Sequence, residues 1–244
     1  MNGKGGTGKT TISSLIMAHL VTEHKGAILA IDADPNSCLA DALGIRDPQT
    51  IVGICDDISK NMNKIPAGMT KERFIEMRVQ EALTEAKGFD LLVMGRPEGP
   101  GCYCYVNNLL RGVIGSLTKN YDFIVIDNAA GMEHISRRTV GTVNKLLLVS
   151  DFSVPGIRST KKIYELAKEL GIKIGCAYLL INKSTGPIYP LGEEIKATGL
   201  KLIGDVPNNE KLAMWSIENR PIFEFEDKEI NNRMEKICEI LMKG

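Results

Sequence analysis

The chain has 244 residues, of which 43% are hydrophobic and 25% are charged, the mix of an ordinary globular protein. Thirty basic residues balance thirty acidic ones, which argues against nucleic acid or an acidic membrane surface as the main partner. No apolar run reaches the ~20 residues that span a bilayer, and the start of the chain has no signal-peptide pattern. We therefore expect a cytoplasmic protein, one domain over residues 1–244, and six cysteines that remain thiols.

Short apolar segments alternate with helical patterns along the chain. The sequence predicts strands at 27–31, 90–94, 123–127, 145–150, 174–181 and 201–204. Helical periodicity predicts helices at 9–23, 71–87, 106–118, 137–143, 156–170, 193–198, 210–218 and 228–242. This alternation indicates an α/β fold with a mostly parallel, twisted sheet and helices on both faces. Weak periodicity with Gly, Pro and Asn predicts an irregular insert at 47–69.

A glycine-rich segment precedes the first predicted helix and fits the P-loop pattern G-x-x-x-x-G-K-[ST]. It spans residues 3–10 with the sequence GKGGTGKT. Its glycines let backbone N–H groups converge on phosphates, and the following helix start favours negative charge. Lys9 is expected to neutralise phosphate oxygens, and the Thr10 hydroxyl to ligate Mg²⁺. The predicted ATP- or ADP-binding residues of this segment are Gly5, Gly6, Thr7, Gly8, Lys9, Thr10 and Thr11.

Two predicted strands end in carboxylates. The first is followed by Asp32 and Asp34, which share one face of an extended chain and are expected to point toward the phosphates. The apolar strand at 123–127 ends in Asp127, and small residues follow it. This pattern is typical of a Walker B carboxylate that holds Mg²⁺, followed by a loop that moves when the γ-phosphate leaves.

A pair of cysteines, Cys102 and Cys104, follows a segment rich in Gly and Pro. Such a segment favours a shaped loop, although two buried thiols in an apolar turn remain the alternative. Thiolates two residues apart can chelate one soft metal ion, but a tetrahedral site requires four ligands. A symmetric dimer would supply the other two, because its two-fold axis brings the same loop in twice.

A second lysine in the glycine-rich segment, Lys4, makes KGGTGKT resemble the deviant Walker A motif of the MinD/ParA/nitrogenase-reductase class of ATPases. The resemblance implies a nucleotide-dependent sandwich dimer, in which Lys4 reaches the nucleotide of the other subunit. It also implies that Asp34 positions or activates the attacking water. Asn182, in an Asn-Lys pair, would read adenine, and Pro207 would lie in the loop that packs against the base.

The start of the chain departs from that class, whose members begin with an apolar strand that leads into the P-loop. Here only Met1 and Asn2 precede Gly3. Either the start is truncated or misassigned, or the sheet has a shortened or missing first strand.

Four segments together resemble a narrower family, the CooC-type maturation ATPases. They are the P-loop with Lys4, residues 32–35 (DADP), residues 95–105 (GRPEGPGCYCY) and residues 127–134 (DNAAGMEH). These ATPases insert nickel into carbon monoxide dehydrogenase, and relatives serve acetyl-CoA synthase. The resemblance implies an ATP-dependent nickel chaperone that forms a nucleotide- and metal-dependent homodimer. In it, Cys102 and Cys104 of each subunit would bind one Ni²⁺, or Zn²⁺ in its place.

Two alternative functions remain open. Nitrogenase reductase also bridges a dimer with four thiolates, but around an iron–sulfur cluster and with cysteines on either side of switch II; here no cysteine lies between Cys104 and Cys176. Positioning ATPases that bind membranes end in a basic amphipathic helix. The last predicted helix here has balanced charges and an apolar stripe formed by Ile230, Met234, Ile237 and Leu241. That pattern favours packing on the core, so neither a membrane nor a nucleic acid is expected as a partner.

Overall fold

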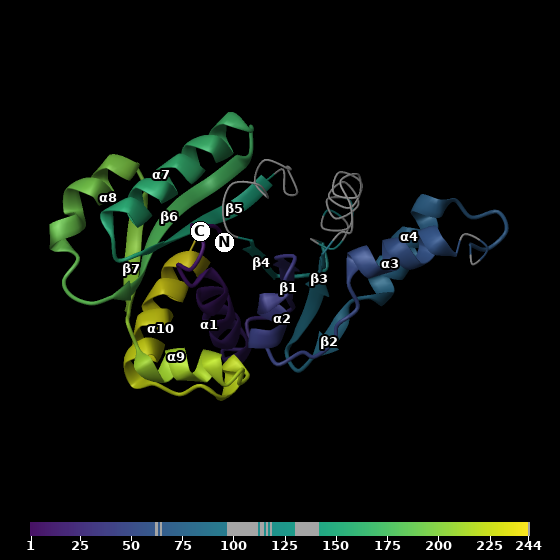
Figure 1. Ribbon diagram of the computed structural model, residues 1–244, viewed down its shortest axis with the longest axis horizontal. Coiled ribbons are helices and arrows are strands. Elements are labelled where there is room, and N and C mark those ends of the chain that lie inside the picture. Colours follow the sequence, from purple (N-terminus) through teal and green to yellow (C-terminus); the bar gives the residue numbers. More distant parts are fainter. Residues whose placement is uncertain are drawn as a thin grey trace.

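The protein has an α/β fold whose strands form a sheet in two parts (Figure 1). The structure is a computed structural model, and it describes residues 1–61, 63, 65–96, 112, 115, 117, 119–129 and 142–243. One part has four strands in the order β2-β3-β1-β4, and the other has three in the order β5-β6-β7. Neighbouring strands run parallel, except that β2 is antiparallel to β3. The strands are β1 (Ile28–Ala33), β2 (Thr84–Ala86), β3 (Phe89–Val93), β4 (Phe123–Asn128), β5 (Thr142–Asp151), β6 (Lys173–Ser184) and β7 (Lys201–Pro207).

Helices cover both faces of this sheet. They are α1 (Lys9–Thr22), α2 (Cys38–Ala42), α3 (Ile51–Lys60), α4 (Lys71–Glu81), α7 (Val154–Glu169), α8 (Gly192–Thr198), α9 (Glu210–Ile217) and α10 (Lys228–Met242). Helices α1 and α10 lie side by side on one face (Figure 1). The opposite face is covered by α3 and α4 over the first part and by α7 and α8 over the second. Among the described residues, no helix has the length and apolar character needed to cross a membrane.

The largest apolar cluster joins both parts of the sheet. It contains Ile12 and Leu15 of α1, Ile28 of β1 and Val149 of β5. All six residues of β1 are buried, as expected for a parallel strand covered on both faces. The α/β class, the parallel strands and the helices on both faces are therefore confirmed. That residues 1–244 form one P-loop domain stays a prediction, which the shared cluster favours.

The segment predicted as an irregular insert contains a helix instead, α3. The Thr50 hydroxyl accepts a hydrogen bond from the Gly53 amide at 3.0 Å and so caps its start. Ile51, Ile54 and Ile58 are buried along one side of the helix. This spacing is helical, but Gly53 and the adjacent Asp56 and Asp57 weaken its signal in the sequence.

Other boundaries also differ from the prediction. The helix expected at 71–87 ends at Glu81, and β2 follows it as the first strand of a hairpin with β3. The short helix α2 was not predicted. The helix expected at 137–143 is wrong for residues 142–143, which begin β5; its residues 137–141 lie outside the described residues. Of the helix expected at 106–118, the described residues 112, 115 and 117 are helical.

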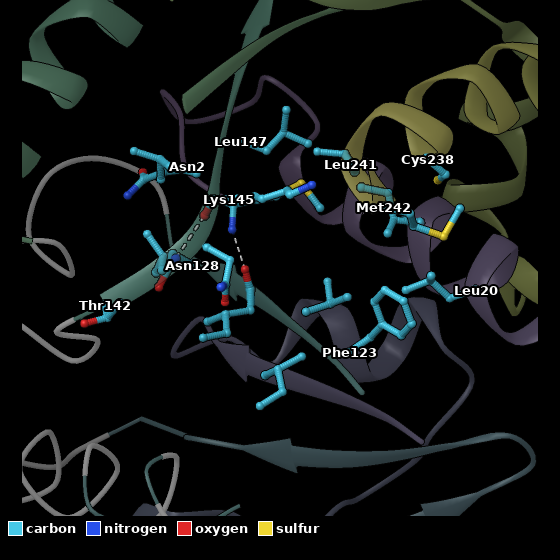
Figure 2. A pocket seen from close by; sticks show the side chains of 18 of the residues that line it. Asn2, Leu20, Phe123, Asn128, Thr142, Lys145, Leu147, Cys238, Leu241 and Met242 are labelled. Atoms are coloured by element: carbon cyan, nitrogen blue, oxygen red, sulfur yellow. Dashed lines mark hydrogen bonds between the residues drawn. The ribbon is translucent and has the colours of Figure 1, made fainter. Parts of the chain in front are cut away.

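The first residues of the given sequence form a single bridge between the two sheet parts and no strand. Asn2, which helps to line a cavity of about 570 Å³ (Figure 2), pairs in parallel with Leu148 of β5. Its amide donates to the Leu147 carbonyl at 3.0 Å, and its carbonyl accepts from the Val149 amide at 2.9 Å. On the other side, the amino group of Met1 donates to the Ile126 carbonyl of β4. Residues 1–2 therefore join β4 to β5 and lead directly into the P-loop.

Candidate nucleotide-binding site

The P-loop needs glycine at particular positions. Gly6 and Gly8 have φ angles of 78° and 83°, in the left-handed region that glycine adopts without strain. A Cβ atom on Gly3 would lie 2.3 Å from the Val149 carbonyl oxygen. The loop thus folds tightly between the Asn2 bridge and the start of α1.

Two lysines of the P-loop occupy different environments. Lys9 is only 7% exposed, and its ammonium donates to the Lys4 carbonyl at 3.2 Å. Burial lowers the pKa of Lys9, while the nearby carboxylates of Asp127 and Asp34 act in the opposite direction. Lys9 is therefore held inside the loop, where a phosphate would lie. The Lys4 side chain is exposed, and its predicted reach into another subunit stays a prediction.

Asp127 and Thr10, the predicted Mg²⁺ ligands, are in contact. The Thr10 hydroxyl donates to one carboxylate oxygen of Asp127 at 2.7 Å, and the Ser13 hydroxyl donates to the other at 2.9 Å. Asp127 is fully buried, and burial raises the pKa of its carboxyl group although both hydrogen bonds oppose the shift. Carboxylate and hydroxyl oxygens are hard donors of the kind that Mg²⁺ takes in nucleotide sites. These residues therefore fit the ion.

Ser13 was not found from the sequence. It lies three residues after Thr10, so both hydroxyls share one side of α1. That spacing is the one signal that could have pointed to it.

Asp32 and Asp34 have different roles in the structure. One oxygen of Asp32 accepts from the amides of Leu39 and Ala40 at 2.8 and 3.0 Å, and the other accepts from the Asp34 amide at 3.1 Å. Burial raises the pKa of Asp32 to about 7, against the effect of these hydrogen bonds. Asp32 therefore holds the loop and α2 in place rather than facing the phosphates as expected. Asp34 is half-buried and remains the candidate to position water.

The Asn-Lys pair at the end of β6 binds the P-loop. Asn182 is 4% exposed, and its side-chain amide donates to the Thr7 carbonyl at 2.9 Å. The ammonium of Lys183 donates to the Gly6 carbonyl at 3.1 Å, a contact that the sequence did not reveal. With its NH₂ group used in this way, the side-chain oxygen of Asn182 is the acceptor that the amino group of adenine would need. Pro207 pairs with Ser184 at the same end of the sheet. Base recognition by Asn182 and Pro207 stays a prediction.

The predicted metal pair, Cys102 and Cys104, lies outside the described residues. Among those that are described, no group of three or more His, Cys, Asp and Glu side chains is placed to hold a metal ion.

Comparisons with known proteins agree with this geometry. Residues 1–174 match a family model described as an AAA domain (AAA_31). An uncharacterized ATP-binding protein of Methanocaldococcus jannaschii is 40% identical over 98% of this chain and 96% of its own length. The carbon monoxide dehydrogenase accessory protein CooC of Rhodospirillum rubrum is 30% identical over 86% of this chain and 87% of its own length.

Solved structures of MinD share the fold. The cell division ATPase MinD of Pyrococcus furiosus superposes with a TM-score of 0.70 at 23% identity, covering 99% of this chain and 95% of that one. The septum site-determining protein MinD of Pyrococcus horikoshii, solved with Mg-ADP, gives a TM-score of 0.68 at 20% identity, covering 100% and 94%. The family match spans more than half of the chain. Together with these relatives, it confirms the predicted ATPase activity. The chain therefore belongs to the AAA domain family (AAA_31) and is an ATP-hydrolysing P-loop enzyme with the fold of MinD.

Proposed function

We propose that the protein is an ATP-dependent nickel chaperone whose client is carbon monoxide dehydrogenase or acetyl-CoA synthase. One observation carries the proposal. The sequence has the pair Cys102 and Cys104, and one of its relatives at 30% identity is named a carbon monoxide dehydrogenase accessory protein. In this reading Ni²⁺ is cargo rather than a resident cofactor.

The nucleotide step is the attack of water on the γ-phosphorus of ATP, which releases ADP and phosphate. The P-loop amides and the Lys9 ammonium would bind the phosphate oxygens and offset their charge. Thr10 and Asp127 would hold Mg²⁺, which supplies further charge neutralisation when bound. Asp34 would orient the attacking water. Catalysis in such a site consists mainly of positioning and electrostatic stabilisation.

The sheet topology supports coupling between nucleotide and cargo. Asp32 of β1 is in register with Val93 of β3 and with Asp127 of β4. The chain after β3, which carries the cysteine pair, therefore leaves the sheet at the same edge as Asp34 and Asp127. An ATP-bound dimer closed by Lys4 would bring two such segments toward its axis, and four thiolates would complete the metal site.

The test combines size-exclusion chromatography with metal analysis. The protein is run without nucleotide, with ADP, and with ATP plus Ni²⁺; we expect one Ni²⁺ per dimer in the last state. The double variant Cys102→Ser/Cys104→Ser should lose that metal. Cys176→Ser is the matched control, because Cys176 is an exposed thiol on β6. If the double variant bound one Ni²⁺ per dimer at unchanged affinity, the proposal would be wrong.

The two other functions have their own tests. With iron and sulfide present under anaerobic conditions, a broad charge-transfer band in the visible spectrum would indicate a cluster of the nitrogenase-reductase kind.

A MinD-like positioning role is favoured by the shared fold. The apolar stripe of α10 argues against a membrane anchor there, because Ile230, Met234 and Ile237 are at most 3% exposed and pack in the core. ATP-dependent co-sedimentation with liposomes or DNA would favour this role.

A further inference from the structure

Lys183, near the end of β6, has a backbone conformation that lysine rarely adopts. Its φ angle is 57°, in the left-handed region where a residue other than glycine is strained. The pairing of β6 with β7 shifts register between Asn182 and Ser184, so Lys183 lies outside the ladder between them. Strain of this kind persists only where the surrounding structure holds it, and it is concentrated at functional positions.

The residues on either side of Lys183 are anchored, which holds the strained conformation in place. Asn182 and Ser184 are both buried. The Ser184 hydroxyl donates to a carboxylate oxygen of Asp205 on β7 at 2.6 Å, and the Ser184 carbonyl accepts from the Asn208 amide at 2.9 Å. Lys183 itself is exposed, so burial of its own side chain does not account for the strain.

The irregularity at Lys183 directs two successive side chains toward one loop. In an extended strand, neighbouring side chains point to opposite faces. Here the side-chain amide of Asn182 donates to the Thr7 carbonyl at 2.9 Å, and the ammonium of Lys183 donates to the Gly6 carbonyl at 3.1 Å. Both side chains therefore reach the P-loop, and the left-handed turn at Lys183 makes the second contact compatible with the first.

These two contacts fix two successive peptide units of the P-loop. A trans peptide is planar, so its carbonyl and its N–H point in opposite directions. Since the carbonyls of Gly6 and Thr7 are directed toward β6, the amides of Thr7 and Gly8 point away from it. No described residue accepts a hydrogen bond from either amide, although Thr7 is only 1% exposed. A buried N–H needs a partner, and a phosphate bound in the loop would supply one.

The peptide unit between Gly6 and Thr7 depends most on Lys183. Gly6 is exposed, and a Cβ atom built on it would meet nothing within 4 Å. A glycine in open space rotates its peptide unit with little steric resistance. A rotated unit would turn its carbonyl oxygen toward the phosphates and repel them. Among the described residues, the Lys183 ammonium is the one donor to the Gly6 carbonyl, so it opposes this rotation.

We propose that Lys183 is a positioning residue for the nucleotide phosphates. It acts on the phosphates of ADP and ATP through the peptide unit between Gly6 and Thr7, without touching the base or the ribose. This role is separate from the predicted reading of adenine by Asn182. Because the contact requires a strained backbone, nucleotide binding and stability should respond in opposite directions when Lys183 is replaced by glycine.

Two variants remove the ammonium in different ways. Lys183→Met keeps the strained backbone, whereas Lys183→Gly relieves the strain. Both should weaken ADP binding by about tenfold or more, while Tm should be higher for Lys183→Gly than for Lys183→Met. Lys183→Arg keeps a cationic donor and should lose less affinity than Lys183→Met. Lys173→Met is the matched control, because it removes an exposed lysine from the other end of β6, and it should bind ADP as the wild type does.

Inorganic pyrophosphate separates an action on the phosphates from a contact with the nucleoside. Competition with a fluorescent ADP analogue measures the Kd of unmodified ADP and of pyrophosphate for each protein. Lys183→Met should weaken the binding of both ligands by the same factor. This factor should persist at high salt, where a general attraction between an exposed charge and the phosphates is screened.

The proposal is overturned if Lys183→Met leaves both affinities unchanged, if it weakens the binding of ADP but not of pyrophosphate, or if its effect disappears at high salt. It is also overturned if Tm and ADP affinity fall together in Lys183→Gly, because the lysine would then only support the fold. None of these readouts involves nickel, so they do not depend on the proposed function.

Discussion

Asp127 interacts with four groups around the predicted Mg²⁺ site. Its carboxylate accepts hydrogen bonds from Thr10 and Ser13. It also interacts electrostatically with the Met1 amino group and with Lys9. A fully buried carboxylate is costly unless hydrogen bonds and cations surround it. Asp127 is therefore held ready for a cation, and the two hydroxyls around it need not contribute equally.

The variant Thr10→Ala should separate the role of the Thr10 hydroxyl from that of the Ser13 hydroxyl. Thr10 is a predicted Mg²⁺ ligand, so we expect kcat for Mg²⁺-dependent ATP hydrolysis to fall by on the order of 100-fold. Ser13→Ala is the matched control. It leaves one oxygen of buried Asp127 without its donor and should lower the free energy of unfolding by about 1–2 kcal/mol, with activity largely kept. An equal loss of kcat in both variants would contradict this assignment.

Asp32 should make stability depend on pH. Its pKa is raised to about 7 in the folded protein from 3.8, so the folded state holds the proton more tightly between these values. The stabilisation is complete below the unfolded pKa and is lost as pH rises toward 7. We expect the stability advantage of the wild type over Asp32→Asn to shrink by about 2–3 kcal/mol between pH 5 and pH 8.

Urea unfolding of both proteins across this pH range measures that difference. A constant or growing advantage of the wild type would show that Asp32 is ionised throughout.

At the residue scale, the sequence predicted the side chains that belong to a contiguous motif. Lys9, Thr10 and Asp127 follow from short patterns whose chemistry is fixed by residue type. Lys183 and the loop-holding role of Asp32 could not be predicted, because each depends on where a distant backbone group lies. The Lys183 ammonium reaches a carbonyl 177 positions away in the sequence.

At the scale of elements, strands were easier to predict than helix ends. A short continuous apolar run such as residues 27–31 is consistent with a fully buried parallel strand, and the strand found there, β1, is buried throughout. Helix α3 was missed because its buried positions are interrupted by Gly53 and by acidic residues. The separation of the sheet into two parts was indicated only by the two residues that precede the P-loop, because among the described residues Met1 and Asn2 bond to the facing edges of β4 and β5.

Thr50 should be important for α3, because its hydroxyl caps the first turn. Thr50→Ala is expected to lower the free energy of unfolding by about 1 kcal/mol. Ser159→Ala is a suitable control. It removes a hydroxyl of α7 whose half-buried side chain donates to the Pro155 carbonyl of the same helix, and it should change stability by less than about 0.5 kcal/mol. Chemical denaturation measures both, and equal effects would mean that the cap contributes little.

At the scale of the whole molecule, the balanced net charge leaves no general electrostatic repulsion between two copies. The proposed dimer would then depend on specific groups for its dependence on ATP, and the exposed Lys4 is the candidate at the nucleotide site. Lys4→Ala should weaken ATP-dependent dimerisation by at least roughly tenfold while ATP binding to the monomer changes little. Lys25→Ala, at an exposed lysine beside Glu23, should dimerise normally.

Sedimentation velocity with and without ATP distinguishes these variants. If Lys4→Ala dimerised as well as Lys25→Ala, Lys4 would not act across the interface.

The P-loop is tied to both parts of the sheet. Asn182 and Lys183 of β6 donate hydrogen bonds to its carbonyl groups, while Thr10 at its end and Ser13 of α1 donate to Asp127 of β4. A nucleotide bound to the P-loop would therefore stabilise the position of the two sheet parts relative to each other. Thermodynamic reciprocity then applies: a change that tightens the junction of β4 and β5 must strengthen nucleotide binding by the same free energy with which the nucleotide tightens the junction.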